Sequence, residues 1–459
     1  MTFRDAADIT RALGYEYLWI DSLCIIQDSV SDWQHECARM QYVYCGAVLT
    51  IAADQAENPS SGLLGAIPTY AEHQCEITVV WPSSLTTERL ILKGPYKRHT
   101  EHTNIVGRSG PLSTRAWAVQ ERLLSSRVLH IRGSRSHFEC SAGRRMDVLP
   151  HLLPLTHPLD DFYGLGTRKD VVRPTLAVGR HDWYKLVAHY ASCKLTQARD
   201  RLPAFSGVAR AVESTFSSRY LAGIWESDLT LGLAWMCESH VTLSSHPATT
   251  QGPTWSWTSC DKPIFYYWAT EDVDRQAWDV QHDLRDILCR NVNCDTWISC
   301  LDLVGAEIET FGGDPFAEVK RGRLSVRGRG QPFGIAEWIE NPVGRAMHHI
   351  TFPGHDISPF HMDVLENPRI TLDRARDSLP ESTELLCLLL GVNFDQSDHG
   401  RLGRRSWYAL GLQPVTGERK AYQRVGLIYM YDRSDEMDEE WEAVVQWLMA
   451  GDIGEIHLV

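Results

Sequence analysis

The apolar positions at the start of the chain recur with the period of an α-helix. Within residues 5–13 (DAADITRAL), Ile9 and Leu13 lie one turn apart, and Gly14 follows where a helix commonly ends. The next segment, residues 15–21 (YEYLWID), is rich in aromatic and branched side chains. We expect this segment to form a β-strand that ends at a carboxylate.

A second helix and a second strand follow in the same alternation. Ser31, with Gln34 three residues later, has the spacing of a capping box. Gly46 is expected to end this helix, and residues 47–53 (AVLTIAA) predict a strand. The helical positions that we expect to be buried are Trp33, Cys37, Met40 and Tyr44. Because helices and strands alternate, the sequence predicts a parallel α/β sheet.

The remaining pattern separates an N-terminal domain from a long C-terminal extension. In the first part we expect a strand pair at 76–81 and 89–93, a helix at 115–125, and strands at 127–131 and 136–140. Residues 147–175 are rich in proline and glycine with little periodicity, which predicts a connector. The predicted domain therefore spans residues 1–146.

The extension, residues 176–459, is expected to have a mixed α+β fold. Its sequence begins helical at 182–215 and then becomes rich in short strand-like runs separated by glycine and proline. An amphipathic helix at 438–449 and a final IHLV strand are expected at its end.

Composition and charge limit the classes of partner. With 459 residues, 43% hydrophobic and 23% charged, the chain is that of a folded protein too long for one ordinary core. A formal net charge of −14 disfavours a phosphate backbone, so we expect no nucleic-acid binding. The basic residues Arg321, Arg323, Arg327 and Arg329 alternate as on the solvated face of a strand.

Three features predict a cytoplasmic protein without a membrane span. The N-terminal sequence MTFRDAADITRALG has no apolar stretch of the kind that a secretory signal needs. The longest apolar run, residues 385–392, is too short to cross a bilayer. The 12 cysteines are scattered without CxxC pairs, as in a protein with reduced thiols.

Most familiar catalytic and metal-binding motifs are missing from the sequence. It has no GxSxG elbow, Walker A loop, HExxH pair or EF-hand loop. The cysteines at 289–300 lack zinc-ligand spacing, and the histidines at 348–361 fall in a segment that predicts a surface loop. We therefore expect no metal site.

Residues 17–53 are the first of two segments dense in candidate functional residues. In a parallel sheet, polar residues beyond the carboxyl ends of the strands are where ligands bind. The candidates at this place are Asp21, Cys24, Gln27 and Asp28.

Glu36 is the candidate acid of the same segment. It lies three residues after Trp33 and four before Met40, which predicts a carboxylate at the border of the buried helix face. A partly desolvated carboxyl beside an aromatic ring would suit general acid/base chemistry or the binding of a ribose hydroxyl. A solvated helix glutamate above a packed tryptophan fits the same spacing.

Residues 110–140 form the second segment. Trp117, Gln120, Glu121 and Leu124 share one face of the expected helix at 115–125. A buried Gln–Glu pair beside a tryptophan needs hydrogen-bond partners, so it belongs either to a structural network or to the wall of a site.

These segments resemble the signatures of the heterokaryon-incompatibility (HET) domain. YLWIDSLCIIQDS, the AVLTIAA strand and Gly62-Leu63 look like the core signature, and TRAWAVQERLLSSRVLHI with FEC is similar to the second. RDRLPA at 199–204 and WSW at 255–257 look like the extension that commonly follows this domain in fungal proteins. The resemblance covers residues 1 to about 260.

The sequence departs from the family at its beginning. Family members usually start with an upstream strand resembling LSYxWG, whereas this sequence starts at the helix that follows that strand. We therefore expect a sheet without this strand, as in a short variant or a protein with a missing first exon.

The resemblance implies an executioner or regulator of cell death in fungal self/non-self recognition, acting with an incompatibility partner protein or by self-association. HET domains are distantly similar to Toll/interleukin-receptor (TIR) domains, which implies a TIR-like, flavodoxin-like fold. In enzymatic TIR domains a glutamate early in a helix supports NAD cleavage, and Glu36 occupies a similar place. By resemblance Glu36 would hold the ribose hydroxyls of the substrate NAD, Trp33 would pack near the ring, and Asp21 and Asp28 would shape the loop. No cofactor is required.

Other functions remain open. The protein is alternatively a truncated, inactive HET protein or a non-catalytic interaction module whose aromatic C-terminal half, including Trp255 and Trp257, supplies a partner surface. A third class is a small-molecule enzyme with a cysteine nucleophile and a histidine base. The local candidates for that chemistry are Cys24, Cys140, His35 and His137.

Overall fold

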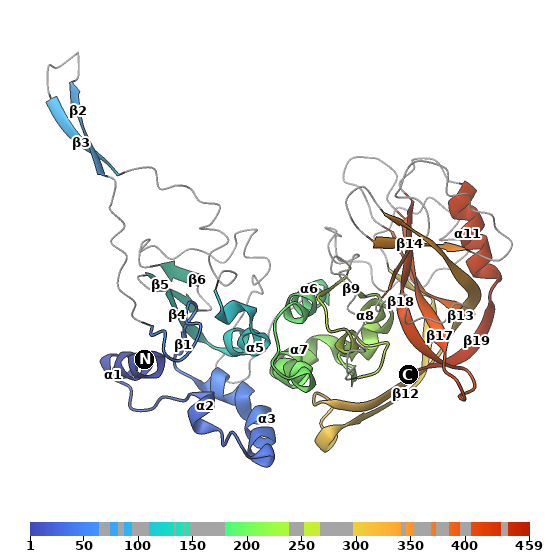
Figure 1. Ribbon diagram of the computed structural model, residues 1–459, viewed down its shortest axis with the longest axis horizontal. Helices are drawn as coiled ribbons and strands as arrows, with labels where there is room; N and C mark the ends of the chain where they lie inside the picture. Colours follow the sequence, from blue (N-terminus) through green and yellow to red (C-terminus); the bar gives the residue numbers. More distant parts are fainter. Residues whose placement is uncertain are drawn as a thin grey trace. The chain divides into compact units, whose positions relative to one another are not determined.

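The computed structural model describes residues 1–63, 74–80, 87–93, 110–132, 135–140, 143–146, 180–237, 252–266, 297–340, 346–351, 369–372, 385–394, 405–432 and 439–459. The chain divides into two compact units, Met1–Ala177 and Val178–Val459 (Figure 1). The expected connector at residues 147–175 lies outside the described residues.

The first helix, α1 (Thr2–Ala12), confirms the helix predicted at residues 5–13 and begins slightly earlier. The Asp5 carboxylate accepts a 2.7 Å hydrogen bond from the backbone N–H of Leu63, which ties the helix to the chain beyond the first strand. Ala6 and Leu63 are buried with Ile131 of the central sheet. The apolar face predicted for this helix is therefore the face that packs against Leu63 and the central sheet.

The strand predicted at residues 15–21 is wrong. Residues 15–20 have no regular secondary structure, and Asp21–Cys24 form the short helix α2. A strand exists only as part of a ladder, and no described strand pairs with this segment. The aromatic and branched side chains give the segment the composition of a strand. Composition alone does not provide a second strand for it to pair with.

The helix α3 (Val30–Gly46) confirms the second predicted helix, but Ser29 caps it in place of Ser31. The Ser29 hydroxyl accepts a 3.2 Å hydrogen bond from the backbone N–H of Asp32. The Asp32 carboxylate accepts a 2.8 Å bond from the N–H of Ile26, which closes the turn between α2 and α3.

A four-stranded sheet forms the centre of the first unit. Its order is β1 (Thr50–Ala52), β4 (Arg127–Arg132), β5 (Arg135–Cys140) and β6 (Gly143–Met146). The predicted strands at 47–53, 127–131 and 136–140 are confirmed, although β1 is short. The pair β1–β4 is parallel, whereas β4, β5 and β6 are antiparallel, so this sheet is mixed rather than parallel.

The other elements of this unit also follow the sequence pattern. The turn η1 (Leu112–Thr114) leads into α5 (Ala116–Leu124), which confirms the helix predicted at 115–125. The antiparallel pair β2 (Gln74–Val80) and β3 (Thr87–Lys93) confirms the predicted strand pair.

The second unit begins with helices. The helical stretch predicted at 182–215 consists of α6 (Arg180–Ala191) and α7 (Ser206–Phe216), with the 3-10 turns η3 (Ala198–Arg201) and η4 (Pro203–Phe205) between them. The short elements that follow are β7 (Tyr220–Leu221), β8 (Ile224–Trp225), η5 (Glu226–Asp228), α8 (Leu229–Leu233), β9 (Met236–Cys237), η6 (Trp257–Ser259) and β10 (Ile264–Phe265). Proline interrupts the helical pattern because it has no backbone N–H to donate.

Tryptophan side chains form the core around these helices. Trp183 lies 6.0 Å from Trp225 between ring centroids, and the Trp257 indole N–H donates a 2.9 Å hydrogen bond to the Gly223 carbonyl. Trp255 and Trp257 are both fully buried. The hypothesis that these two residues supply a partner surface is therefore wrong, because neither is accessible.

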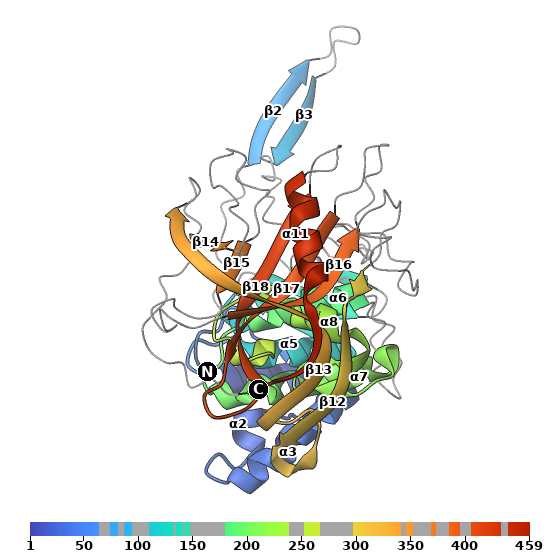
Figure 2. The same cartoon turned by 90° about the vertical axis from the view of Figure 1, so that its right-hand side faces the viewer.

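A nine-stranded sheet completes the second unit (Figure 2). Its strands are β11 (Ile298–Ser299), β12 (Leu301–Thr310), β13 (Val319–Glu340), β14 (Ala346–Thr351), β15 (Arg369–Leu372), β16 (Leu385–Phe394), β17 (Arg405–Pro414), β18 (Ala421–Asp432) and β19 (Asp452–Leu458), with the turn η7 (Phe311–Gly313) after β12. The order is β11-β16-β17-β18-β15-β14-β13-β12, and β13 also pairs with β16 and β19, so the sheet curves back on itself.

The helix α11 (Glu439–Ala450) covers this sheet and confirms the helix predicted at 438–449. Val444 and Trp447 pack into the same core cluster as Phe333 of β13. The four basic residues of the alternating cluster lie on β13, where Arg329 donates to the Met449 carbonyl at 2.8 Å. None of the described helices combines the length and the apolar character needed to cross a lipid bilayer.

A buried arginine joins the two halves of this unit. Arg424 of β18 is 1% exposed, and its guanidinium donates to the backbone carbonyls of Leu233 and Trp235. The guanidinium carbon lies 3.6 Å from the ring centroid of Trp235. Because a buried cation needs compensation, these carbonyls and the ring fix β18 against the helical part.

We expect Arg424→Met to lower the free energy of unfolding by about 2–4 kcal/mol, since two buried carbonyls lose a charged donor. Urea denaturation of the full chain, followed by tryptophan fluorescence, measures the effect. Arg419→Met is the matched control because Arg419 is exposed, and it should change stability by less than about 0.5 kcal/mol. Equal midpoints for the two variants would contradict the role of Arg424.

Candidate functional site

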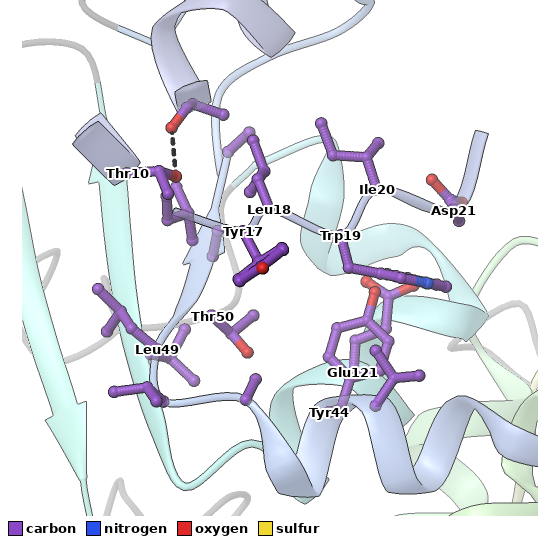
Figure 3. A pocket seen from close by; sticks show the side chains of 18 of the residues that line it. Thr10, Tyr17, Leu18, Trp19, Ile20, Asp21, Tyr44, Leu49, Thr50 and Glu121 are labelled. Atoms are coloured by element: carbon purple, nitrogen blue, oxygen red, sulfur yellow. Dashed lines mark hydrogen bonds between the residues drawn. The ribbon is translucent and has the colours of Figure 1, made fainter. Parts of the chain in front are cut away.

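A cavity of about 630 Å³ opens in the first unit, within the roughly 300–1,000 Å³ range of small-molecule sites (Figure 3). Its walls come from α1, the segment before α2, the end of α3, β1 and α5. The residues that line it are Thr2, Phe3, Ala6, Thr10, Leu13, residues 15–21, residues 42–44, residues 46–53, Leu63, Leu112, Arg115, Glu121, Arg122 and Val128. Most of this lining is apolar.

One end of the cavity holds a cluster of interacting polar groups. Tyr44, from the last turn of α3, donates a hydrogen bond to the Glu121 carboxyl of α5. Trp19 packs edge-on against the Tyr44 ring, with the centroids 5.8 Å apart. Asp21 lines the same cavity (Figure 3). The exposed Arg115 also lines it.

Burial, and to a smaller extent the negative charge of Asp21, raises the pKa of the Glu121 carboxyl from 4.5 to about 7. The Arg115 guanidinium and the hydrogen bond from Tyr44 act in the opposite direction. A carboxyl with a pKa near neutrality can both give and accept a proton at physiological pH. Glu121 is therefore equipped for acid/base chemistry.

Tyr44 supports this carboxyl as a fixed donor. Burial and the neighbouring charge of Glu121 raise the pKa of the Tyr44 hydroxyl well above its usual value. The hydroxyl consequently keeps its proton and points it at the carboxyl.

A buried charge network includes Arg122, the residue after Glu121. His130 of β4, 2% exposed, contacts Asp54 through Nδ1 (3.1 Å) and Glu139 of β5 through Nε2 (3.3 Å). Glu139 accepts a 2.9 Å hydrogen bond from Arg122, the residue after Glu121. The network ties α5 to the sheet and so fixes the direction in which Glu121 points.

Two of the predicted site residues, Asp21 and Glu121, meet in the cavity although a hundred residues separate them in the sequence. Sequence analysis missed the contributions of Tyr44, Trp19 and Arg115. Tyr44 had been assigned to the buried face of its helix, and only the packing of α3 against α5 gives it a carboxyl partner. The polar network around His130 carried no sequence signal, because its members come from three strands or loops and one helix.

Glu36 does not line the cavity. Its side chain is 20% exposed, and its carboxylate contacts Arg39 at 3.3 Å and His35 at 3.8 Å on the same helix. The expected partial burial is therefore present, but the neighbours are charged side chains of α3.

Trp33 and Trp117 form an edge-to-face contact, with ring centroids 6.5 Å apart, between α3 and α5. Gln120 is buried on the same helix as Trp117. Neither tryptophan lines the cavity. In the described structure these residues pack the two helices that carry Tyr44 and Glu121.

The remaining candidates lie on the surface around α2. The Gln27 amide donates to the Ile25 carbonyl at 2.8 Å and to the Asp21 carbonyl at 3.3 Å, so it holds the turn. Asp28 and Cys24 are exposed, and no described histidine forms a hydrogen bond with Cys24. Across the described ranges, no group of three or more His, Cys, Asp or Glu residues could hold a metal ion.

The raised pKa of Glu121 predicts a pH-dependent stability. The folded carboxyl holds its proton up to about pH 7, whereas the unfolded one releases it near 4.5, so the stability present below pH 4.5 is lost as pH rises through 7. The Glu121→Gln variant mimics the protonated acid. In the wild type we expect the free energy of unfolding to fall by on the order of 2–3 kcal/mol between pH 4.5 and 7, and in Glu121→Gln we expect this decrease to be absent. Thermal denaturation of the full chain across this pH range measures it. A wild-type slope in Glu121→Gln would contradict the assignment.

Comparison with curated proteins and with solved structures found no match. The comparison with family models matched residues 1–121 to the family described as heterokaryon incompatibility protein (HET). The matched range contains every cavity-lining residue except Arg122 and Val128. Residues 1–121 of this chain thus match the heterokaryon-incompatibility (HET) domain.

Proposed function

We propose that this protein acts in heterokaryon incompatibility as an effector or regulator of cell death, and that the cavity of its HET domain is the working site. The observation that carries the proposal is that nearly all residues that line the cavity lie within the range that matches the HET family. The proposed setting is the cytoplasm, with an incompatibility partner protein or a second copy of the chain as partner.

The proposed reaction is hydrolysis of NAD at the nicotinamide–ribose bond. Water adds to the ribose carbon, nicotinamide leaves with the bonding electron pair, and the products are ADP-ribose, nicotinamide and a proton. Bond cleavage of this kind develops positive charge on the ribose, which a nearby carboxylate stabilises. Glu121 supports this role through its position in the cavity and its pKa of about 7.

The other groups at the polar end of the cavity have complementary roles in this proposal. Asp21 would accept hydrogen bonds from ribose hydroxyls, and Tyr44 would orient the Glu121 carboxylate. Arg115, exposed at the rim, would pair with the pyrophosphate. Glu36 is the alternative carboxyl that the resemblance to TIR domains implies, so the two acids are tested side by side.

We expect purified full-length protein to consume NAD at high or crowded concentration, and Glu121→Gln to lower the rate at least about 100-fold. Glu57→Gln is the matched control because Glu57 is exposed and does not line the cavity. NAD consumption and nicotinamide release are measured together at low and high protein concentration.

Loss of activity in Glu36→Gln, with Glu121→Gln still active, would return the catalytic role to Glu36. The absence of turnover in every variant would rule out the NAD reaction and leave a non-catalytic HET protein.

The pH dependence of kcat/KM tests the state in which Glu121 works. If the carboxylate stabilises the ribose, the rate rises as pH increases through about 7 and then levels off, because the acid is protonated below that value. A rate that falls through the same range would assign Glu121 as a proton donor. A profile without any inflection near 7 would exclude Glu121 from the rate-limiting step.

The second candidate function is a non-catalytic interaction module. It is favoured by the exposed apolar side chains around the cavity mouth, among them Tyr17 and Leu18, which a small polar substrate does not need.

A further inference from the structure

Two buried cysteines of the second unit lie with their sulfur atoms in contact. Cys237 ends the strand β9, and Cys260 directly follows the 3-10 turn η6. The Cys260 thiol donates to the Cys237 sulfur across 3.4 Å. Cys237 is 1% exposed and Cys260 is 4% exposed. Because the two residues are 23 positions apart in the sequence, the fold and not the local chain brings the thiols together.

Contacts on both sides of the pair hold the thiols in this position. Cys237 belongs to the antiparallel ladder of β9 and β10. Two residues before it, the indole N–H of Trp235 donates to the Trp255 carbonyl at 3.0 Å. The backbone N–H of Cys260 donates to the Trp257 carbonyl at 3.2 Å. The segments that carry the two cysteines are therefore fixed against each other by contacts that do not involve the sulfur atoms.

The separation of the two sulfur atoms is small enough for a covalent bond to form by side-chain rotation. The sulfur atoms of a disulfide lie about 2.05 Å apart, so the two must approach each other by about 1.4 Å. Shared between two side chains, this is a movement of about 0.7 Å for each sulfur, which a modest rotation about each Cα–Cβ bond supplies. The backbone frame of β9 and η6 does not have to move.

The side of the pair nearer to solvent is that of Cys260. This residue is followed by Asp261, which is exposed. Hydrogen peroxide is nearly as small as water, whereas a bulky disulfide such as oxidised glutathione needs a wider opening. The expected oxidant is therefore a small peroxide.

We propose that Cys237 and Cys260 form a site of reversible modification, at which hydrogen peroxide converts the two thiols into a disulfide bond. One thiol gives up its proton and its sulfur attacks a peroxide oxygen, so that the O–O bond breaks and a sulfenic acid and water form. The second sulfur then attacks the sulfenic sulfur, the S–O bond breaks, and the hydroxyl leaves as water with the second thiol proton. One peroxide is reduced, two thiols are oxidised, and two waters are released.

The disulfide would tie the end of β9 to the end of η6, within the tryptophan core of the second unit. A thiol reductant restores the two thiols, because thiol–disulfide exchange runs in both directions. The proposal goes beyond the NAD reaction and does not depend on it.

The test is peptide mapping of the folded, full-length protein after exposure to hydrogen peroxide. Remaining thiols are blocked with N-ethylmaleimide under denaturing conditions. A protease that cleaves after glutamate then separates the two cysteines, because Glu238 lies between them. We expect the peptides that contain Cys237 and Cys260 to be recovered joined to each other, and dithiothreitol to separate them. Cys24→Ser, which removes an exposed thiol of the first unit, is the control and should leave the joined peptides unchanged.

Thermal denaturation measures the consequence of the bond. A disulfide restricts the unfolded chain, so we expect the oxidised wild type to unfold at least about 4 °C above the reduced protein. Cys24→Ser should show the same shift, and Cys260→Ala should show none. Each protein is compared with itself before and after peroxide, so any change in stability caused by Cys260→Ala itself does not affect the comparison.

Three results would overturn the proposal. The first is recovery of both cysteines as N-ethylmaleimide adducts after peroxide treatment. The second is formation of the joined peptides only when the protein is oxidised in the unfolded state, since the folded contact would then play no part. The third is oxidation of either thiol to sulfinic acid without a bridge. The mapping is carried out without NAD, so its failure is distinguishable from failure of the proposed reaction.

Discussion

The arrangement of the first unit depends on the buried contacts of His130. Its ring joins Asp54, which follows β1, to Glu139 of β5, and Glu139 in turn holds Arg122 of α5. Two acids and two basic groups lie together at low exposure, and their mutual contacts compensate for hydration that each loses on burial. Neither the strand order nor the direction of α5 can change without breaking one of these contacts. Glu121, next to Arg122, faces Tyr44 for this reason.

The lining of the cavity differs between its two ends. At one end the chemistry is polar: Glu121 is held between Tyr44, Asp21 and Arg115, and its proton affinity matches neutral pH. Along the rest, residues 15–20 and β1 contribute mostly apolar side chains. The two ends of the cavity therefore differ in polarity.

The second unit is held together differently. Its large core tryptophans are buried. The guanidinium of Arg424 donates hydrogen bonds to the backbone carbonyls of Leu233, at the end of α8, and of Trp235, just before β9. The sequence indicated many aromatic residues and a strand-rich extension, and the closing helix and strand were predicted at nearly the observed positions. It did not distinguish a core tryptophan from an interface tryptophan, because burial depends on neighbours far away in the chain. Trp255 and Trp257 belong to the core for that reason.

The sequence by itself determined most local elements: the helices α1, α3, α5 and α11, and the strands β1, β4 and β5. It also determined the HET resemblance of residues 1–121, since periodicity, caps and signature motifs are local properties. Only the tertiary structure decided that residues 15–20 have no strand partner and that Glu36 pairs with Arg39. It likewise decided that Glu121 and Tyr44 share a cavity. Strand pairing, desolvation and the proximity of charges are set by residues distant in sequence, and no local pattern specifies them.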